Sequence, residues 1–147
     1  MTTTIAEECR DAVVSTIRSL NLDGVALDEV VSRDAPDDWT GFKPRGISVV
    51  ALEEQELPGT NRSEDYGYPF LIIRASGTGK GRDEMGAVTS RWRDAIRKAF
   101  NQRRLAGVAA VWICIVNNGD FLPQRPWEDN RALSSLVVTC WARERRV

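Results

Sequence analysis

Histidine is absent from this chain of 147 residues, and cysteine is scarce. Without histidine the chain lacks the commonest general base, the commonest transition-metal ligand and every Ser–His or Cys–His nucleophile pair. Cys9, Cys114 and Cys140 are odd in number and widely spaced, which fits neither a disulfide framework nor a zinc site. We expect them to be small buried apolar residues. The sequence therefore predicts no enzyme, no cofactor and no bound metal.

Long hydrophobic runs are also missing. No stretch approaches the roughly 20 apolar residues of a membrane span, and the first residues carry no basic segment followed by an apolar run. Hydrophobic residues make up 42% and charged residues 28% of the chain, as in ordinary soluble proteins. We expect a single domain over residues 1–147, synthesised in the cytoplasm and without membrane contact.

Charge of one sign is unevenly divided along the chain. Residues 1–66 hold 14 Asp and Glu against six Lys and Arg, a net of −8, whereas residues 67–147 hold seven acids against 14 bases, a net of +7. If folding places the two halves on different faces, one copy offers an acidic surface where the next offers a basic one. Such a division favours head-to-tail association into a ring or stack.

Two amphipathic helices are indicated by apolar residues at helical spacing. The first is expected from Thr4 to Leu20, with Thr4 as N-cap and Glu7 completing a capping box. The second is expected from Asp83 to Gln102, with an apolar stripe and an otherwise basic surface. Strands are expected at Val25–Val31, Ile47–Leu52, Tyr68–Ala75, Val108–Val116 and Leu133–Ala142.

Polar segments rich in Pro, Gly and Asn predict long loops at Asp34–Arg45, Glu53–Gly67 and Asn117–Asn130. The order of elements predicts an α+β fold, an α/β sandwich in which a mixed or mostly antiparallel sheet of four to five strands carries two helices on one face. The last strand is apolar on both sides and therefore requires cover on both.

Two motifs of the chain favour structural interpretations over chemical ones. The Gly-rich stretch Gly77–Gly81 lacks the first glycine and the hydroxyl of a phosphate-binding loop, so it is expected to be a turn. Carboxylate pairs occur in predicted loops or at a helix start, where solvated acids are ordinary. They are Asp37–Asp38, Glu53–Glu54–Glu56, Glu64–Asp65 and Asp83–Glu84.

The basic second helix invites a nucleic-acid interpretation, but Trp92 falls on its apolar stripe and the chain has a pI of about 5.6. We therefore expect its arginines to face protein, and we do not expect direct nucleic-acid binding. Trp92, Trp112 and Trp141 are expected in the core or at an interface. Trp39 and Trp127 lie in Pro-containing loops, where they either pack on their own domain or act as interface anchors.

The order of elements over nearly the whole chain resembles the tail terminator (tail-completion) proteins of long-tailed bacteriophages and prophages. The resemblance is carried by IAEECRDAVVSTIRSL, GISVVAL, YPFLIIRA, DEMGAVTSRWRDAIRKAF, VAAVWICIV and LSSLVVTCWARER in that order. It implies a homo-oligomeric ring, a hexamer in that family, which caps the tail tube and joins it to the head connector. It also implies assembly in the bacterial cytoplasm and residence in the virion tail or neck, with tail-tube and neck proteins as partners.

The charge division suggests which residues would meet in such a ring. We expect basic residues of the second helix to face acidic residues of a neighbouring subunit, with two loop tryptophans as further candidates. The candidates are Arg91, Arg93, Arg97, Lys98, Asp37, Asp38, Glu53, Glu54, Glu56, Trp39 and Trp127. The Glu53–Gly67 segment would be an arm that reaches a neighbour.

Two alternatives stay open at this point. Another head-to-tail connector protein or a tail-tube-like subunit would share the same assembly chemistry without the termination step. A small metal-dependent hydrolase or nuclease would use clustered carboxylates, and would bind divalent metal. The absence of histidine and the placement of the acids in loops rank the hydrolase lower.

Overall fold

The computed structural model describes residues 3–22, 30–33, 47–57, 63–76, 82–118 and 132–145. In chain order its elements are α1 (Ile5–Ser19), β1 (Val30–Arg33), β2 (Ile47–Ala51), β3 (Gln55–Leu57), β4 (Ser63–Ser76), α2 (Arg82–Phe100), β5 (Val111–Asn118) and β6 (Ala132–Arg145). The expected α+β class is confirmed.

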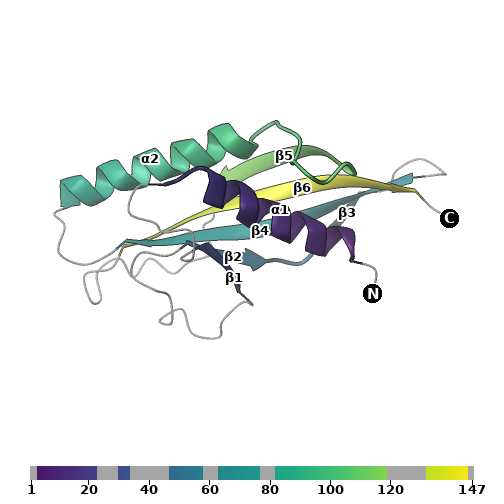
Figure 1. The fold of residues 1–147 in the computed structure, drawn as a ribbon, viewed down its shortest axis with the longest axis horizontal. Coiled ribbons are helices and arrows are strands. Elements are labelled where there is room, and N and C mark those ends of the chain that lie inside the picture. The colour runs from purple at the N-terminus through teal and green to yellow at the C-terminus, as the bar shows by residue number, and fades with distance from the viewer. Residues whose placement is uncertain are drawn as a thin grey trace.

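The strands form one mixed, mostly antiparallel sheet (Figure 1). Their order is β1-β2-β4-β6-β5, and the three-residue strand β3 pairs with β4 beside this path. Only β1 and β2 run parallel; the other pairs are antiparallel. The central pair, β4 and β6, stays in register from Ser63↔Arg145 to Ser76↔Ala132. This ladder is the framework on which the other elements rest.

Helix α1 begins where the sequence predicts. The Thr4 hydroxyl accepts a hydrogen bond from the Glu7 backbone N–H, and the Glu7 carboxylate accepts one from the Thr4 N–H, each at 3.2 Å. This capping box satisfies two donors that the first turn leaves open. Cys9, Val13 and Ile17 form the buried stripe and pack on the sheet. The exposed acids and Arg18 occupy the rest of the surface.

Helix α2 covers the same face of the sheet beside α1. Trp92, Ile96 and Phe100 are each at most 1% exposed and share one apolar core with the α1 stripe. Each such side chain contributes roughly 1.5–3 kcal/mol by leaving water. Alpha helices α1 and α2 lie over different strands: α1 contacts β1, β2 and β4, whereas α2 contacts β5 and β6. The prediction of two helices on one face is confirmed.

The opposite face of the sheet holds a second, smaller apolar cluster. Its buried members are Val50, Leu71, Ile73 and Val137. Because side chains alternate along a strand, Leu136 and Val138 of β6 face the helices whereas Val137 faces this second cluster. The expectation that the last strand is buried on both sides is therefore confirmed.

The expected loop at Glu53–Gly67 is in part a hairpin, which corrects the sequence-based assignment. Gln55–Leu57 pairs with Asp65–Gly67, and β4 begins at Ser63, five residues before the predicted start at Tyr68. The same stretch of β4 also pairs with the end of β6. Figure 1 shows this end of β4 and β6 extending beyond the helices. Its polar residues are strand-forming because two neighbouring strands satisfy their backbone groups.

The outer edge of β5 is occupied by the chain that leaves α2. The Gln102 N–H donates to the Cys114 carbonyl and the Cys114 N–H donates to the Arg103 carbonyl, both at 2.8 Å. The Val116 N–H donates to Asn101 Oδ1 at 3.1 Å. Gln102 reaches this position with a φ of 58°. Two turns follow, which begin at the buried residues Leu105 and Val108. Strand β5 therefore starts at Val111 rather than at the predicted Val108.

Candidate assembly surface

Arg93 joins α2 to the strand ends beneath it. Its guanidinium donates to the Ser135 carbonyl of β6 at 2.6 Å and to Asn118 Oδ1 at the end of β5 at 2.8 Å. Arg97 donates to the same Asn118 oxygen at 3.2 Å. These contacts lie within one chain. The pairing of Arg93 and Arg97 with acids of a neighbour stays a prediction, but both residues already position α2.

The other two predicted cations of α2 are placed differently. Lys98 pairs with Asp94 at 2.9 Å, four residues earlier, and this hydrogen bond raises the pKa of Lys98. Both side chains are well exposed. Arg91 is exposed and forms no hydrogen bond or ion pair with any residue of the described ranges. Arg91 is therefore the predicted cation that is most available to a partner.

An acid-bearing hollow lies at the N-terminal end of α1. It has a volume of about 290 Å³ and is lined by Ala6, Glu7, Arg10, Ala51, Leu52, Glu54, Tyr68, Pro69 and Phe70. Glu53 and Glu54, in the connection between β2 and β3, are both exposed. Arg10 pairs with its neighbour Asp11 at 3.3 Å. Of the predicted acidic residues, Glu54 lines the hollow beside its apolar floor, and the exposed Glu53 precedes it in the chain.

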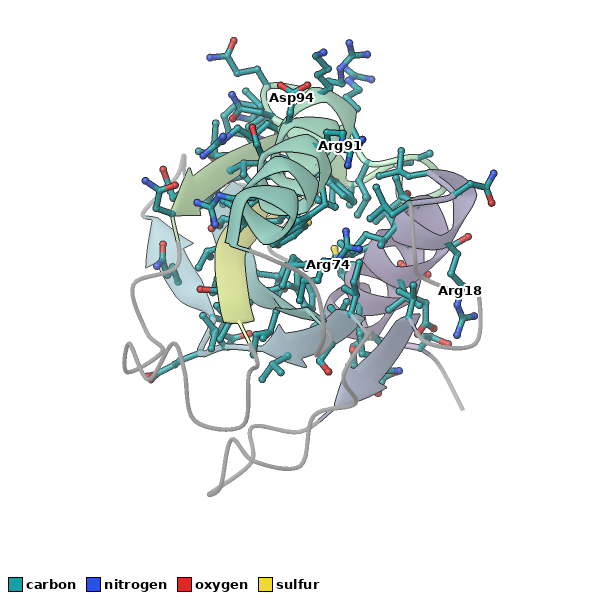
Figure 2. The ribbon with its side chains drawn as sticks, turned by 90° about the vertical axis from the view of Figure 1, so that its left-hand side faces the viewer. Arg18, Arg74, Arg91 and Asp94 are labelled. Atoms are coloured by element: carbon teal, nitrogen blue, oxygen red, sulfur yellow. The ribbon has the colours of Figure 1, made fainter. Side chains whose placement is uncertain are left out.

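A basic hollow lies at the other end of α1. It has a volume of about 190 Å³ and is lined by Leu20, Asn21, Leu22, Arg74, Arg91, Trp92 and Ala95. Arg74 lies on the helix-facing side of β4, because side chains alternate along a strand and Arg74 is two and four residues from Ile72 and Phe70, which face the helices. Figure 2 shows Arg74 and Arg91 facing the space between α1 and α2. Sequence reasoning missed this hollow because Arg74 lies within an apolar strand.

The acidic and basic hollows are separated by the length of α1. One is lined by residues of its first two turns and the other by the residues that follow its last turn. A helix of 15 residues spans roughly 22 Å, at about 1.5 Å per residue. Opposite charges at opposite ends of one element can meet only between different copies.

Asp37, Asp38, Trp39 and Trp127 lie outside the described residues, as do Gly77–Gly81. Glu56 is described by its backbone alone, in β3 and opposite Tyr66 of β4. The predicted set is therefore placed in part, and its exposed and described members are Arg91, Arg97, Lys98, Glu53 and Glu54.

An exposed tryptophan marks a further surface at the other end of the sheet. Trp112 is 43% exposed and sits at the irregularity in β5 between Val111 and Ile113. The Arg143 guanidinium lies 5.8 Å from its ring centroid and donates through Nε to Asp65 at 3.1 Å. A bulge turns a side chain away from its expected direction. Sequence periodicity placed Trp112 in an apolar run and gave no sign of this exposure.

The three cysteines are brought together in the core although they are far apart in sequence. All are free and fully buried, and Cys114 Sγ lies 3.8 Å from Cys140 Sγ on the neighbouring strand. Contact with the thiols of Cys114 and Cys9, together with burial, raises the pKa of Cys140. The expectation of buried apolar-type cysteines is confirmed.

Within the described ranges no group of three or more His, Cys, Asp or Glu is arranged to hold a metal ion. Neither α1 nor α2, the helices in the described part, is long and apolar enough to cross a membrane. No protein-family model matches this chain, and no curated protein matches its sequence.

Proposed function

We propose that this chain is a structural subunit that closes into a ring through head-to-tail contacts and acts as the tail terminator of a long-tailed phage or prophage. The observation that carries the proposal is the placement of an acidic hollow and a basic hollow at opposite ends of α1. Contacts between unlike surfaces generate a ring when the rotation between copies closes.

The contact would bring Glu53 and Glu54 of one copy toward Arg91 of the next. A single exposed ion pair contributes only about 0–1 kcal/mol, and salt screens it. In a ring the same contact recurs at every interface, so small contributions add up. The apolar floor of the acidic hollow includes Leu52 and Phe70. It supplies apolar contact area, which ion pairs alone do not provide.

The specific role at the tail is supported by the order of helices and strands that resembles tail terminators. A ring with one face on the tail tube and the other on the neck would stop tube growth and join tail to head. Other head-to-tail connector proteins and tail-tube-like subunits would share the ring but would not end tube growth. The resemblance favours the terminator among these.

Ring formation is tested by light-scattering mass and negative-stain microscopy at low and high salt. We expect closed rings at low salt that loosen at high salt. The double variant Glu53→Lys with Glu54→Lys should remain monomeric, and so should Arg91→Glu. Mixing these two variants should restore mixed rings. Arg104→Glu, an exposed reversal elsewhere, is the matched control and should assemble normally. A wild-type monomer at every concentration and salt would contradict self-assembly.

Termination needs its own assay. Purified tail-tube protein should form tubes that are shorter and more uniform in length when wild-type rings are added. Tube length is measured by electron microscopy. The non-assembling Arg91→Glu variant should leave the tube lengths unchanged. Rings that form but do not alter tube length would support a connector role instead of termination.

A further inference from the structure

The basic hollow combines a cavity with hydrogen-bond donors of three kinds. Arg74 and Arg91 contribute guanidinium groups, Asn21 an amide and Trp92 an indole N–H. The lining residues within the described part of the chain include no carboxylate. The hollow therefore concentrates positive charge and donors at one place between α1 and α2.

Arg74 is the unusual member because it is only 5% exposed. Removing a guanidinium from water costs several kcal/mol unless an anion or hydrogen-bond acceptors compensate it. A guanidinium has five N–H donors in a planar fork, more than a single acceptor can use. Its buried Nε–H has no hydrogen-bond acceptor among the residues that the structure describes, so Arg74 keeps donor capacity for an oxyanion in addition to the contacts that it already makes.

Trp92 supplies an independent observation. Its indole Nε1–H is buried and has no hydrogen-bond acceptor among the described residues. Leaving a buried donor unsatisfied costs roughly 1–3 kcal/mol. Trp92 is 1% exposed and lines the same hollow as the two arginines. An acceptor in this hollow has an indole donor nearby as well as two charged donors.

We propose that the hollow binds one oxyanion group, a phosphate or a carboxylate, held by the guanidiniums of Arg74 and Arg91. Planar guanidinium groups pair with both in bidentate fashion. A volume of about 190 Å³ accommodates a single such group and not a large ligand. Arg91, which lies at the exposed rim on α2, admits and holds the group, while Arg74 forms the charged floor.

The oxyanion has two possible sources with the same chemistry. It is either a free phosphate-type ion or a carboxylate side chain of a second copy, and the second source rests on the proposed function. Binding of a free phosphate-type ion can be measured on the protein in any oligomeric state. A failure of ring formation therefore leaves the phosphate experiment intact, and the two proposals can fail separately.

The test follows the indole N–H resonances of the tryptophans by NMR while inorganic phosphate is added, with the Trp92 signal assigned through Trp92→Phe. Sodium chloride at equal ionic strength is the control. We expect a saturable shift of the Trp92 signal with phosphate only. Arg91→Gln should weaken phosphate binding roughly tenfold or more, the size of a lost charge-assisted hydrogen bond. Arg104→Gln, which removes the same charge elsewhere, should not.

A second arm distinguishes the sources. In phosphate-free buffer the protein is concentrated, and a Trp92 shift that phosphate reverses would identify the oxyanion as a carboxylate of another copy. A shift with phosphate alone would identify a free ion. The proposal is overturned if neither treatment moves the Trp92 signal, or if Arg91→Gln binds phosphate as tightly as the wild-type chain. Arg91 is exposed, so this variant is expected to fold.

Discussion

The ring of Trp141 lies against Gly67, its direct partner on the neighbouring strand. A Cβ atom placed on Gly67 would come within 2.9 Å of two ring carbons of Trp141. Glycine at this position therefore leaves the space that the aromatic ring fills. An aromatic side chain that covers a glycine across two strands also compensates for the packing that glycine itself lacks.

We expect Gly67→Ala to lower the free energy of unfolding by about 1 kcal/mol, because Trp141 must move away from β4. In a Trp141→Ala background the same change should be neutral or slightly stabilising, since alanine restricts the unfolded chain. Urea unfolding of the four proteins gives the coupling between the two sites. Equal effects of Gly67→Ala in both backgrounds would show that the ring contact is unimportant.

Arg93 should matter for stability in a way that Arg91 does not. Arg93→Gln removes the hydrogen bonds to the Ser135 carbonyl and to Asn118, and we expect a loss of roughly 1–3 kcal/mol. Arg91→Gln is the matched control on the same helix and should leave the midpoint of urea unfolding unchanged. If both variants unfold alike, the Arg93 contacts contribute nothing to stability.

Consequently, a charge reversal at Arg93 cannot by itself test subunit pairing. Such a variant would weaken the attachment of α2 to β5 and β6 before it reached any neighbour. Assembly experiments on Arg93 or Arg97 therefore need a parallel unfolding curve. Arg91 allows a cleaner test, because it has no hydrogen bond or ion pair with the described residues to lose.

Stability should fall in alkaline solution because of the buried Cys140 thiol. Its pKa is raised in the folded chain, whereas an ordinary thiol has a value of 9.0. Above about pH 9 the unfolded chain loses this proton while the folded chain keeps it. The stability contribution of Cys140 is therefore full below pH 9 and decreases as pH rises further, by about 1.4 kcal/mol per pH unit.

The measurement is urea unfolding between pH 8 and 10.5, compared with Cys140→Val. Other groups titrate in the same range, so the informative quantity is the difference between the two pH slopes. We expect the wild-type chain to lose stability more steeply than the variant. Parallel slopes would mean that Cys140 ionises as easily in the folded chain as in the unfolded one.

Local features of the fold were readable from the sequence, and α1 is the clearest case. Its capping box, apolar stripe and end all follow from residues within four positions of one another. Strand β4 shows the limit. Ser63–Gly67 is polar and reads as a loop, yet pairing with β6, far along the chain, makes it strand. Such pairing depends on partners that periodicity does not reveal.

The sequence indicates which types of residue belong to the candidate site, but it does not indicate which residues contact one another. Net charge drew attention to the cations of α2 as candidates, but the acceptors of Arg93 lie 25 and 42 positions away in sequence. Arg74 was hidden within an apolar strand, and its burial beside α2 depends on how α1 and α2 sit on the sheet. Three-dimensional packing, rather than composition, distinguishes anchoring arginines from available ones.

The closed edge of β5 limits how copies can meet. Gln102 and Arg103 already use the Cys114 backbone groups that face outward. An incoming strand would have to displace the segment that follows α2 before it could bond there, so backbone-to-backbone growth into fibres is disfavoured along this side of the sheet. Contacts between copies at this side are therefore made by side chains. The fit and charge of side chains discriminate between correct and incorrect neighbours, whereas peptide groups are the same in every chain.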